Sequence, residues 1–277
     1  MAPVRIVTDS TAFLKEETIK QYNITVVPLY VNFENEVILD GSISNATFFD
    51  RLKKSAKMPF TSQPSPGDFV KVFEPILEQG DDIVTLVISS GISGTYESAT
   101  NAAKLLDPKR IGVVDSIITS GGLAMLVKEA SEAAIEGKTK DEIVELMEDK
   151  KRRLRLFFIP DTLEYLKKGG RIGGAQALLG TLLKIKPVLY LNSGKVDTYD
   201  KVRTMKKAMG RIVDEIPPAK GPFTLTVVHG EAIDNANKLK DMIIERFPEA
   251  EVIIDELSPV IGTHAGPGVV GLCFYAQ

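Results

Sequence analysis

The chain has 277 residues, of which 44% are hydrophobic and 26% charged, and its formal net charge at pH 7 is −3. This composition excludes a disordered chain, and the lack of a basic excess argues against a nucleic-acid partner. Cys273 is the only cysteine, which excludes an intramolecular disulfide, and no apolar run reaches the roughly 18 to 20 residues of a membrane span. We therefore expect a cytoplasmic protein whose length favours two domains.

The N-terminal half alternates β-branched runs with helical patterns. Strands are expected at Val4–Val7, Ile83–Ser89 and Arg110–Asp115, and helices at Asp68–Gln79, Glu97–Leu106 and Ser120–Glu136. The run Ile24–Phe33 is also strand-like, but Pro28 predicts an edge, a bulge or a break there. The alternation predicts a largely parallel sheet with helices on both faces. In such sheets, ligands bind at the carboxyl ends of the strands.

The C-terminal half mixes a hairpin with strand–helix units. A charged, amphipathic pattern at Asp141–Leu154 predicts a surface helix that bridges two lobes, residues 1–155 and 156–277. Five strands and two helices are expected beyond it: Leu156–Pro160, Val188–Leu191, Val196–Lys201, Phe223–His229 and Glu251–Leu257, with helices at Lys206–Glu215 and Ala232–Phe247. Asn192–Lys195 is typical of a hairpin turn, so this lobe is expected to contain a mixed α/β sheet.

An anion site is predicted where the strand Ile83–Ser89 ends. The segment Leu86–Ala99 contains an apolar run, then serines and glycines, then a helical pattern. Backbone N–H groups at a helix N-terminus attract negative charge, and the Ser93 hydroxyl would add a donor while Gly94 allows close approach of a ligand. No P-loop lysine is present, which argues against a nucleoside triphosphate. The alternative is that these hydroxyls only cap the helix.

Two further segments offer polar side chains. Thr61, Ser62 and Gln63 lie in a proline-flanked loop with little freedom to move, which suits recognition; the alternative is a simple helix start. His264 lies in the glycine-rich stretch Ile261–Gly268, expected to be a loop, where an imidazole can donate to an oxyanion. The alternative there is a histidine that binds a loop carbonyl.

Two basic segments are further candidate sites, and two alternative functions are considered beside them. Arg171 and Arg203 lie in short basic segments suited to a carboxylate or a phosphate, or to a solvated surface. Two separated histidines and one cysteine give no metal-ligand pattern. A hydrolase with Ser93 as nucleophile and His264 as base is an alternative function, although no G-x-S-x-G elbow is present. A regulatory module that senses small phosphates is a third.

Six segments taken together resemble one family. They are VTDSTAFL, TSQPSPGDF, ISSGISGTYESA, DTLEYLKKGGRI, KVRTMKKA and IGTHAGPG, and in this order they are similar to the bacterial DegV family of fatty-acid-binding proteins from Val7 to Gly271. The resemblance implies two α/β lobes with a long-chain fatty acid between them and its tail buried in a tunnel. It also implies that the carboxylate is held by Thr61, Ser62, Ser93, Gly94 and His264.

The resemblance implies partners as well. Some members of the family pass the acid to an ATP-dependent kinase subunit that makes acyl phosphate for phospholipid synthesis, and Arg171 and Arg203 would then orient the head group or contact that subunit. A transient contact with a membrane is a further expectation. The implied ligand is the fatty acid alone, with no cofactor and no catalysis by this chain. The apolar stretch Ile172–Leu191 is expected to be mostly core and is also a candidate tunnel wall.

Overall fold

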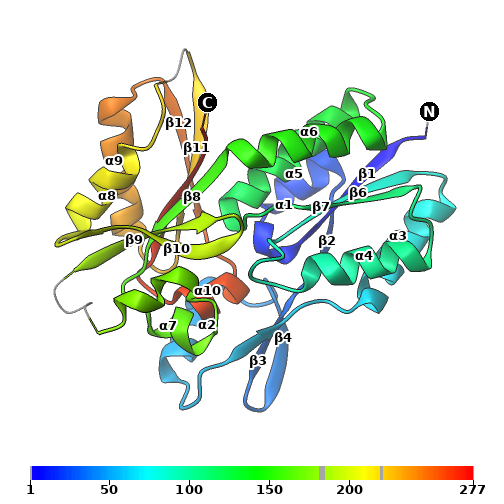
Figure 1. Cartoon of the computed structure of the whole chain (residues 1–277). Coiled ribbons are helices and arrows are strands. Elements are labelled where there is room, and N and C mark those ends of the chain that lie inside the picture. Colours follow the sequence, from blue (N-terminus) through cyan, green and yellow to red (C-terminus); the bar gives the residue numbers. More distant parts are fainter. Residues whose placement is uncertain (1, 181–184, 219–220, 277) are drawn as a thin grey trace.

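Sheet A, in the N-terminal half, is parallel throughout. The protein is described as a computed structural model over residues 2–180, 185–218 and 221–276, and it has an α/β fold (Figure 1). The four strands of sheet A follow the order β2-β1-β6-β7. They are β1 (Val4–Asp9), β2 (Thr25–Val27), β6 (Asp82–Val87) and β7 (Ile111–Asp115). The chain moves outward from β1 to β2 and then returns to β6, so the strand order reverses between β1 and β6, where ligands bind in such sheets.

Helices cover both faces of sheet A, as the alternation of strands and helices predicted. They are α1 (Glu16–Tyr22), α3 (Pro66–Glu78), α4 (Thr95–Leu105), α5 (Ser120–Ile135) and α6 (Lys140–Arg153). Val7 and Ile83 face the core under α3 and α4, whereas Ile6 and Val84 face the core under α5 and α6. Neighbouring strand residues point to opposite faces, so buried residues on both faces require the continuous apolar runs seen in these strands.

Sheet C, in the C-terminal half, is mixed, as predicted. Its order is β10-β9-β8-β13-β11-β12, with only β11 and β12 parallel among the described pairs. The strands are β8 (Leu154–Ile159), β9 (Lys186–Asn192), β10 (Lys195–Val202), β11 (Phe223–His229), β12 (Ala250–Glu256) and β13 (Val270–Tyr275). Helices α8 (Met205–Val213) and α9 (Ile233–Arg246) cover one face. The predicted boundary after residue 155 lies inside β8, and a division into domains at that point stays a prediction.

Helix α5 lies between the two sheets. It contacts β1 and β6 of sheet A, and also β8, β11 and β13 of sheet C. Its buried residues Leu123, Leu126 and Val127 belong to one apolar cluster with Val84 of sheet A and Cys273 of sheet C. The two halves therefore share a core through α5. No helix in the described part of the chain is long and apolar enough to cross a membrane.

A small antiparallel sheet, sheet B, belongs to the N-terminal half and contacts a helix of the C-terminal half. Its strands are β3 (Tyr30–Phe33), β4 (Glu36–Leu39) and β5 (Phe60–Ser62), in the order β4-β3-β5, with α2 (Asn45–Lys54) between β4 and β5. The helix α10 (Pro259–Ala265) packs against α2, β3, β5 and α7 (Glu164–Lys168). Pro28 separates β2 from β3, so the predicted strand Ile24–Phe33 is broken there. Sheet B brings β5 next to a helix that lies about two hundred residues later in the chain.

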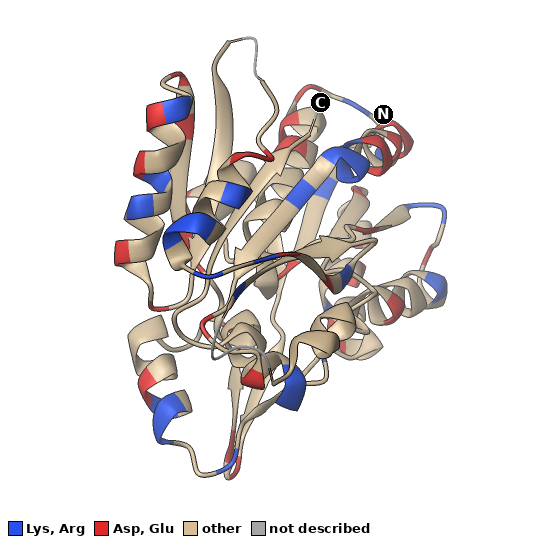
Figure 2. Cartoon of the chain, turned by 60° about the vertical axis from the view of Figure 1, so that its left-hand side comes forward, with Lys and Arg blue, Asp and Glu red and all other residues tan. Residues whose placement is uncertain are grey.

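Charges of both signs are mixed over the outer helices. Figure 2 shows Lys and Arg interspersed with Asp and Glu along the outer helices in that view. Many of them form exposed ion pairs, such as Lys54 with Asp50 on α2 and Arg246 with Asp214. Pairs of this kind contribute little to stability.

Candidate functional site

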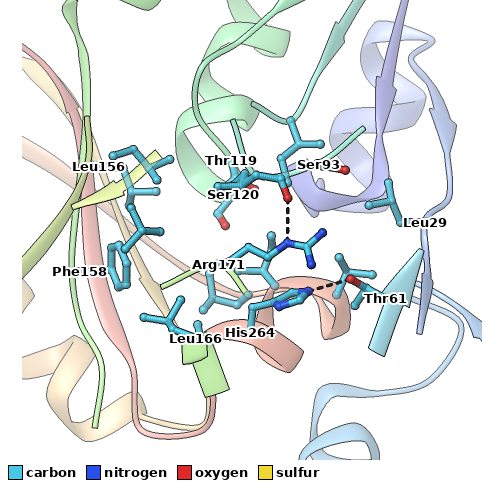
Figure 3. Close-up of a pocket in the computed structure, with 18 of the residues that line it drawn as sticks. Leu29, Thr61, Ser93, Thr119, Ser120, Leu156, Phe158, Leu166, Arg171 and His264 are labelled. Atoms are coloured by element: carbon cyan, nitrogen blue, oxygen red, sulfur yellow. Dashed lines mark hydrogen bonds between the residues drawn. The ribbon is translucent and has the colours of Figure 1, made fainter. Parts of the chain in front are cut away.

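A cavity lies between the two halves, beyond the carboxyl ends of β6 and β7, where Ile88, Ser93 and Thr119 line it. The cavity and its opening span about 860 Å³. Its walls are largely apolar, and much of the wall comes from sheet C and from the segment between β12 and β13: Leu156, Phe158, Val228, Leu257, Val260 and Val269. Thr61, Ser93, Arg171 and His264 lie near one another in Figure 3. Ser62 and Gln63, next to Thr61 in sequence, also line the cavity. The arrangement suits a ligand with a long apolar part and a polar end.

The stretch Ile172–Leu191 is mostly core, as expected, and contributes little to the cavity wall. Leu191 lines the cavity, whereas Leu178, Val188 and Leu189 are buried within the apolar clusters of the two sheets. Residues 181–184 lie outside the described residues. The wall comes from strands of sheet C because their cavity-facing positions alternate with positions that face α8 and α9.

Strand β5 directs its two hydroxyl residues to opposite faces. Thr61 pairs with the buried Val31 in the register of β3, whereas Ser62 pairs with Tyr30. The Ser62 hydroxyl accepts a hydrogen bond of 3.1 Å from the Asn32 side-chain amide. Both residues line the cavity, but only Thr61 forms a hydrogen bond with His264.

His264 meets Thr61 across 203 residues of sequence. The Thr61 Oγ1 to His264 Nε2 distance is 2.7 Å, and Nδ1 is buried with no hydrogen-bond partner among the described residues. Burial, and then the nearby Arg171 guanidinium, lower the pKa of His264 to about 4. The imidazole is therefore neutral at physiological pH, and it can hydrogen-bond a carboxylate without adding charge.

His264 stands on a short helix and not in the glycine loop that the sequence led us to expect. Proline at the first position and the Ser258 cap start α10, because Ser258 Oγ accepts from the Ile261 N–H. The buried Asp40 accepts from the Val260 N–H at 2.9 Å and from the Ser10 hydroxyl at 2.8 Å. Burial raises the pKa of Asp40 to about 7. These contacts fix the helix that carries His264 against the N-terminal half.

Gly169 supports the ring of His264 from α7. A Cβ atom built on Gly169 would lie 2.2 Å from His264 Nδ1, which is closer than atoms can approach. Glycine is therefore required for the imidazole to occupy this position. Gly169 lies two residues before Arg171, and its contact with His264 was not predicted from the sequence.

Ser93 and Gly94 lie at the start of α4, as predicted. Ser93 Oγ is 2.9 Å from Thr95 Oγ1 and also accepts from the Thr95 N–H at 3.4 Å. Gly94, the residue before the helix, makes no side-chain cap, and the Gln63 side chain packs where a Cβ of Gly94 would lie. The hydroxyl thus has a local role at the helix start and also faces the cavity, which combines both interpretations of this segment.

The loop before Ser93 is fixed by the hairpin of the other half. Ser89 donates to the Gly194 carbonyl at 2.8 Å, and Gly194 has a φ of +80° in the predicted turn between β9 and β10. A side chain on Gly91 would collide with the same carbonyl. Loop and hairpin therefore hold each other at the rim of the cavity.

Only one of the two predicted arginines reaches the site. Arg171, labelled in Figure 3, donates from Nε to the Ile92 carbonyl at 3.0 Å. It also donates from Nη1 to the Gly169 carbonyl at 2.8 Å. It lines the cavity and also an adjoining outer hollow, which is lined as well by Ser93 and Gly94. Arg203 is exposed before α8 and lines neither space.

Thr119 and Ser120, at the start of α5, also line the cavity and were not predicted. Their segment nevertheless repeats the pattern that singled out Ser93: a buried strand ends at Asp115, hydroxyl residues follow, and the glycines of a helix start come next. That pattern was a usable signal for a cavity-facing position.

The geometry of the hydrolase alternative is not found in the described residues. His264 Nε2 pairs with Thr61, and Ser93 Oγ pairs with Thr95. A nucleophile and its base would need a mutual hydrogen bond. No group of three or more His, Cys, Asp or Glu side chains in the described ranges could hold a metal ion.

Fold and site together define a class: a two-lobed α/β protein with an apolar cavity that ends in hydroxyl, imidazole and guanidinium groups. The chain belongs to the DegV family, because the family model, which is described as an uncharacterised protein of the DegV family, matches residues 3–277.

Individual relatives agree over the whole length. A DegV domain-containing protein of Halalkalibacterium halodurans is 38% identical over 282 residues, with 100% of both chains covered. The solved structure of a fatty-acid-binding DegV family protein from Thermus thermophilus superposes with a TM-score of 0.94 at 36% identity, over 99% of this chain and 100% of that one. DegV from Bacillus subtilis, a fatty acid binding protein, gives a TM-score of 0.88 at 31% identity, with 100% of both chains covered.

Proposed function

We propose that this protein binds a long-chain fatty acid, with the tail in the cavity and the carboxylate at its polar end. The observation that carries the proposal is the convergence of Thr61, Ser93 and His264, from three distant segments, on one end of an apolar cavity. Fatty acid binding by relatives that cover the whole chain supports the same ligand.

The apolar walls account for affinity. Burying one CH₂ group contributes about 0.8 kcal/mol, so a 16-carbon tail offers on the order of 10 kcal/mol. That gain is relative to water, so the cavity offsets what the tail loses on leaving a micelle or a membrane, which is where a transient membrane contact would occur. A phosphate-sensing module would leave these walls without a role.

The polar end accounts for the head group. A buried carboxylate is costly unless it is hydrogen-bonded. In the proposed site the Thr61 and Ser93 hydroxyls are donors, and the single N–H of the neutral His264 ring, on Nε2, is shared between Thr61 and the carboxylate. Gly94 supplies backbone at the start of α4, and Ser62 lies beside them on β5. Arg171 adds a positive charge at the edge. The neutral state of His264 fits a site that binds the anion through hydrogen bonds.

Access to the head group supports a carrier role. Ser93 and Arg171 line both the cavity and the outer hollow, so a carboxylate at Ser93 is reachable from outside while the tail stays buried. We propose that the carboxylate is presented there to an ATP-dependent kinase subunit for acyl-phosphate formation. Arg203, exposed and outside the cavity, is proposed as a contact for that subunit.

A titration of the delipidated protein tests the binding proposal. The protein is titrated with palmitic acid, its methyl ester and inorganic phosphate, and binding is followed by calorimetry. We expect saturable one-to-one binding of the acid, weaker binding of the ester, and none of phosphate. Binding of phosphate without the acid would favour the sensing module, and turnover of acyl esters would favour the hydrolase.

A further inference from the structure

The start of α5 contributes a second group of polar side chains to the cavity wall. Thr119 and Ser120 line the cavity and are only 6% and 3% exposed. Neither Thr119 Oγ1 nor Ser120 Oγ has a hydrogen-bond partner among the described residues. Figure 3 shows both residues between Ser93 and Leu156 in that view.

The two hydroxyls are not explained by a structural role. Thr119 precedes the 16-residue helix α5 yet makes no side-chain cap bond to it. Ser120 has a φ of +53°, a conformation that non-glycine residues seldom adopt. A buried hydroxyl without a partner is costly in an apolar wall. A ligand atom that hydrogen-bonds both would remove that cost.

The surroundings of these hydroxyls favour a neutral partner. A Cβ atom on the neighbouring Gly121 would touch Thr226 and Val228 of β11, so the helix start packs closely on an apolar strand. The one cationic side chain that lines the cavity in the described ranges, Arg171, is bonded to the Ile92 carbonyl on the Ser93 side. A carboxylate is therefore bound on the Ser93 side, while the start of α5 offers two hydroxyl groups and no cationic side chain among the described lining residues.

We propose that Thr119 and Ser120 form a subsite for an oxygen atom carried along the acyl chain, so that the cavity accepts hydroxylated fatty acids. The proposal rests on the proposed function, because it takes the carboxylate to lie at the Ser93 and His264 end. The acyl hydroxyl would replace the missing partners of both side chains. Apart from these two residues and the polar residues of the carboxylate end, the described lining of the cavity is apolar.

A positional series of ligands tests the subsite. Stearic acid and hydroxystearic acids with the hydroxyl at successive chain positions are titrated against the wild type, Thr119→Val and Ser120→Gly. Valine keeps the shape of threonine, and glycine adopts the φ of Ser120 without strain. Thr85→Val is the matched control, because Thr85 is equally buried and unpartnered but does not line the cavity.

We expect at least one hydroxy acid to bind the wild type as tightly as stearic acid or more tightly. Thr119→Val and Ser120→Gly should weaken the binding of that acid by about five- to a hundredfold. The affinity for stearic acid should stay the same, and Thr85→Val should change neither affinity. Hydroxy acids that all bind more weakly than stearic acid, by the same factor in every variant, would overturn the subsite alone. Failure of the wild type to bind stearic acid would overturn the proposed function and the subsite together.

Discussion

The two sides of the proposed head-group site are built in different ways. On the Ser93 side, the hydroxyl is held by Thr95, two residues away, at the start of α4. On the His264 side, the imidazole depends on Thr61 across 203 residues, and its helix depends on Asp40, which is 220 residues from Val260. The Ser93 hydroxyl has a local partner, whereas the contact of His264 with Thr61 exists only when the two halves are folded against each other. Damage to the second side should therefore propagate further.

The largest effect is expected from Gly169→Ala. A methyl group at this position would displace the imidazole from Thr61, so the carboxylate would lose the contribution of both residues. Two hydrogen bonds to a charged group correspond to a loss of affinity of at least about 100-fold, measured by calorimetric titration of palmitic acid. Gly210→Ala is the control, because its Cβ would lie an ordinary 3.8 Å from Met242. Equal affinity of both variants would show that the His264 side does not bind the ligand.

Single removals of donors should have intermediate effects. Ser93→Ala, Thr61→Val and His264→Ala should each weaken the binding of palmitic acid by roughly 10- to 150-fold, since each removes a hydrogen bond to a charged group. Thr61 and His264 share a hydrogen bond, so their double variant should lose less than the sum of the two single losses. The methyl ester should respond less to all of these changes. If the variants keep their circular dichroism spectrum and bind palmitic acid as the wild type does, the hydroxyls are only structural.

The pH dependence of stability separates two groups on the His264 side. The pKa of His264 is lowered to about 4, so the unfolded chain binds its proton more readily and His264 lowers stability as the pH falls from 7 to 5. The pKa of Asp40 is raised to about 7, so the folded chain binds that proton more readily and Asp40 raises stability over the same interval. Each contribution amounts to about 2 kcal/mol.

Variants expose these opposite contributions. Relative to the wild type, His264→Gln should gain about 2 kcal/mol of unfolding free energy between pH 7 and pH 5, and Asp40→Asn should lose a similar amount. Urea denaturation at pH 5, 6, 7 and 8 measures both differences. Parallel pH profiles for the wild type and both variants would contradict the buried states assigned to these side chains.

The smallest effect on ligand binding is expected from Arg203→Glu. This residue lies outside the cavity, so palmitic acid should bind with nearly unchanged affinity. Formation of acyl phosphate by a cognate kinase should fall at limiting carrier concentration, because charge complementarity governs encounter and register. Unchanged acyl-phosphate formation at low and moderate salt would remove Arg203 from the partner surface.

The local parts of the molecule could be predicted from the sequence, whereas contacts between distant segments could not. Periodicity and turn residues predicted sheets A and C, the hairpin at Gly194 and the position of Ser93. The strand β13 was missed, although it lies between β8 and β11, because its apolar run follows closely on a glycine-rich segment. Those glycines also hid α10, whose start depends on Ser258 and Asp40.

The same distinction applies within the site. Spacing in the sequence does not show that Thr61 meets His264 or that Gly169 supports the ring, since both contacts require the packing of α10 against β5 and α7. The sequence marked Thr61 and His264 separately as polar candidates, and only the family resemblance assigned both to one carboxylate. Gly169 was in no predicted site. Thr119 and Ser120 follow the same local pattern as Ser93, a buried strand followed by hydroxyl residues and a helix start, but they were not predicted as site residues.

Native mass spectrometry of the protein purified from cells tests the central claim most directly. We predict a bound mass that corresponds to one long-chain fatty acid per chain, confirmed by solvent extraction, and loss of most of that mass in Gly169→Ala but not in Gly210→Ala. A wild-type protein that carries no acyl chain and takes up none from added palmitic acid would contradict the claim.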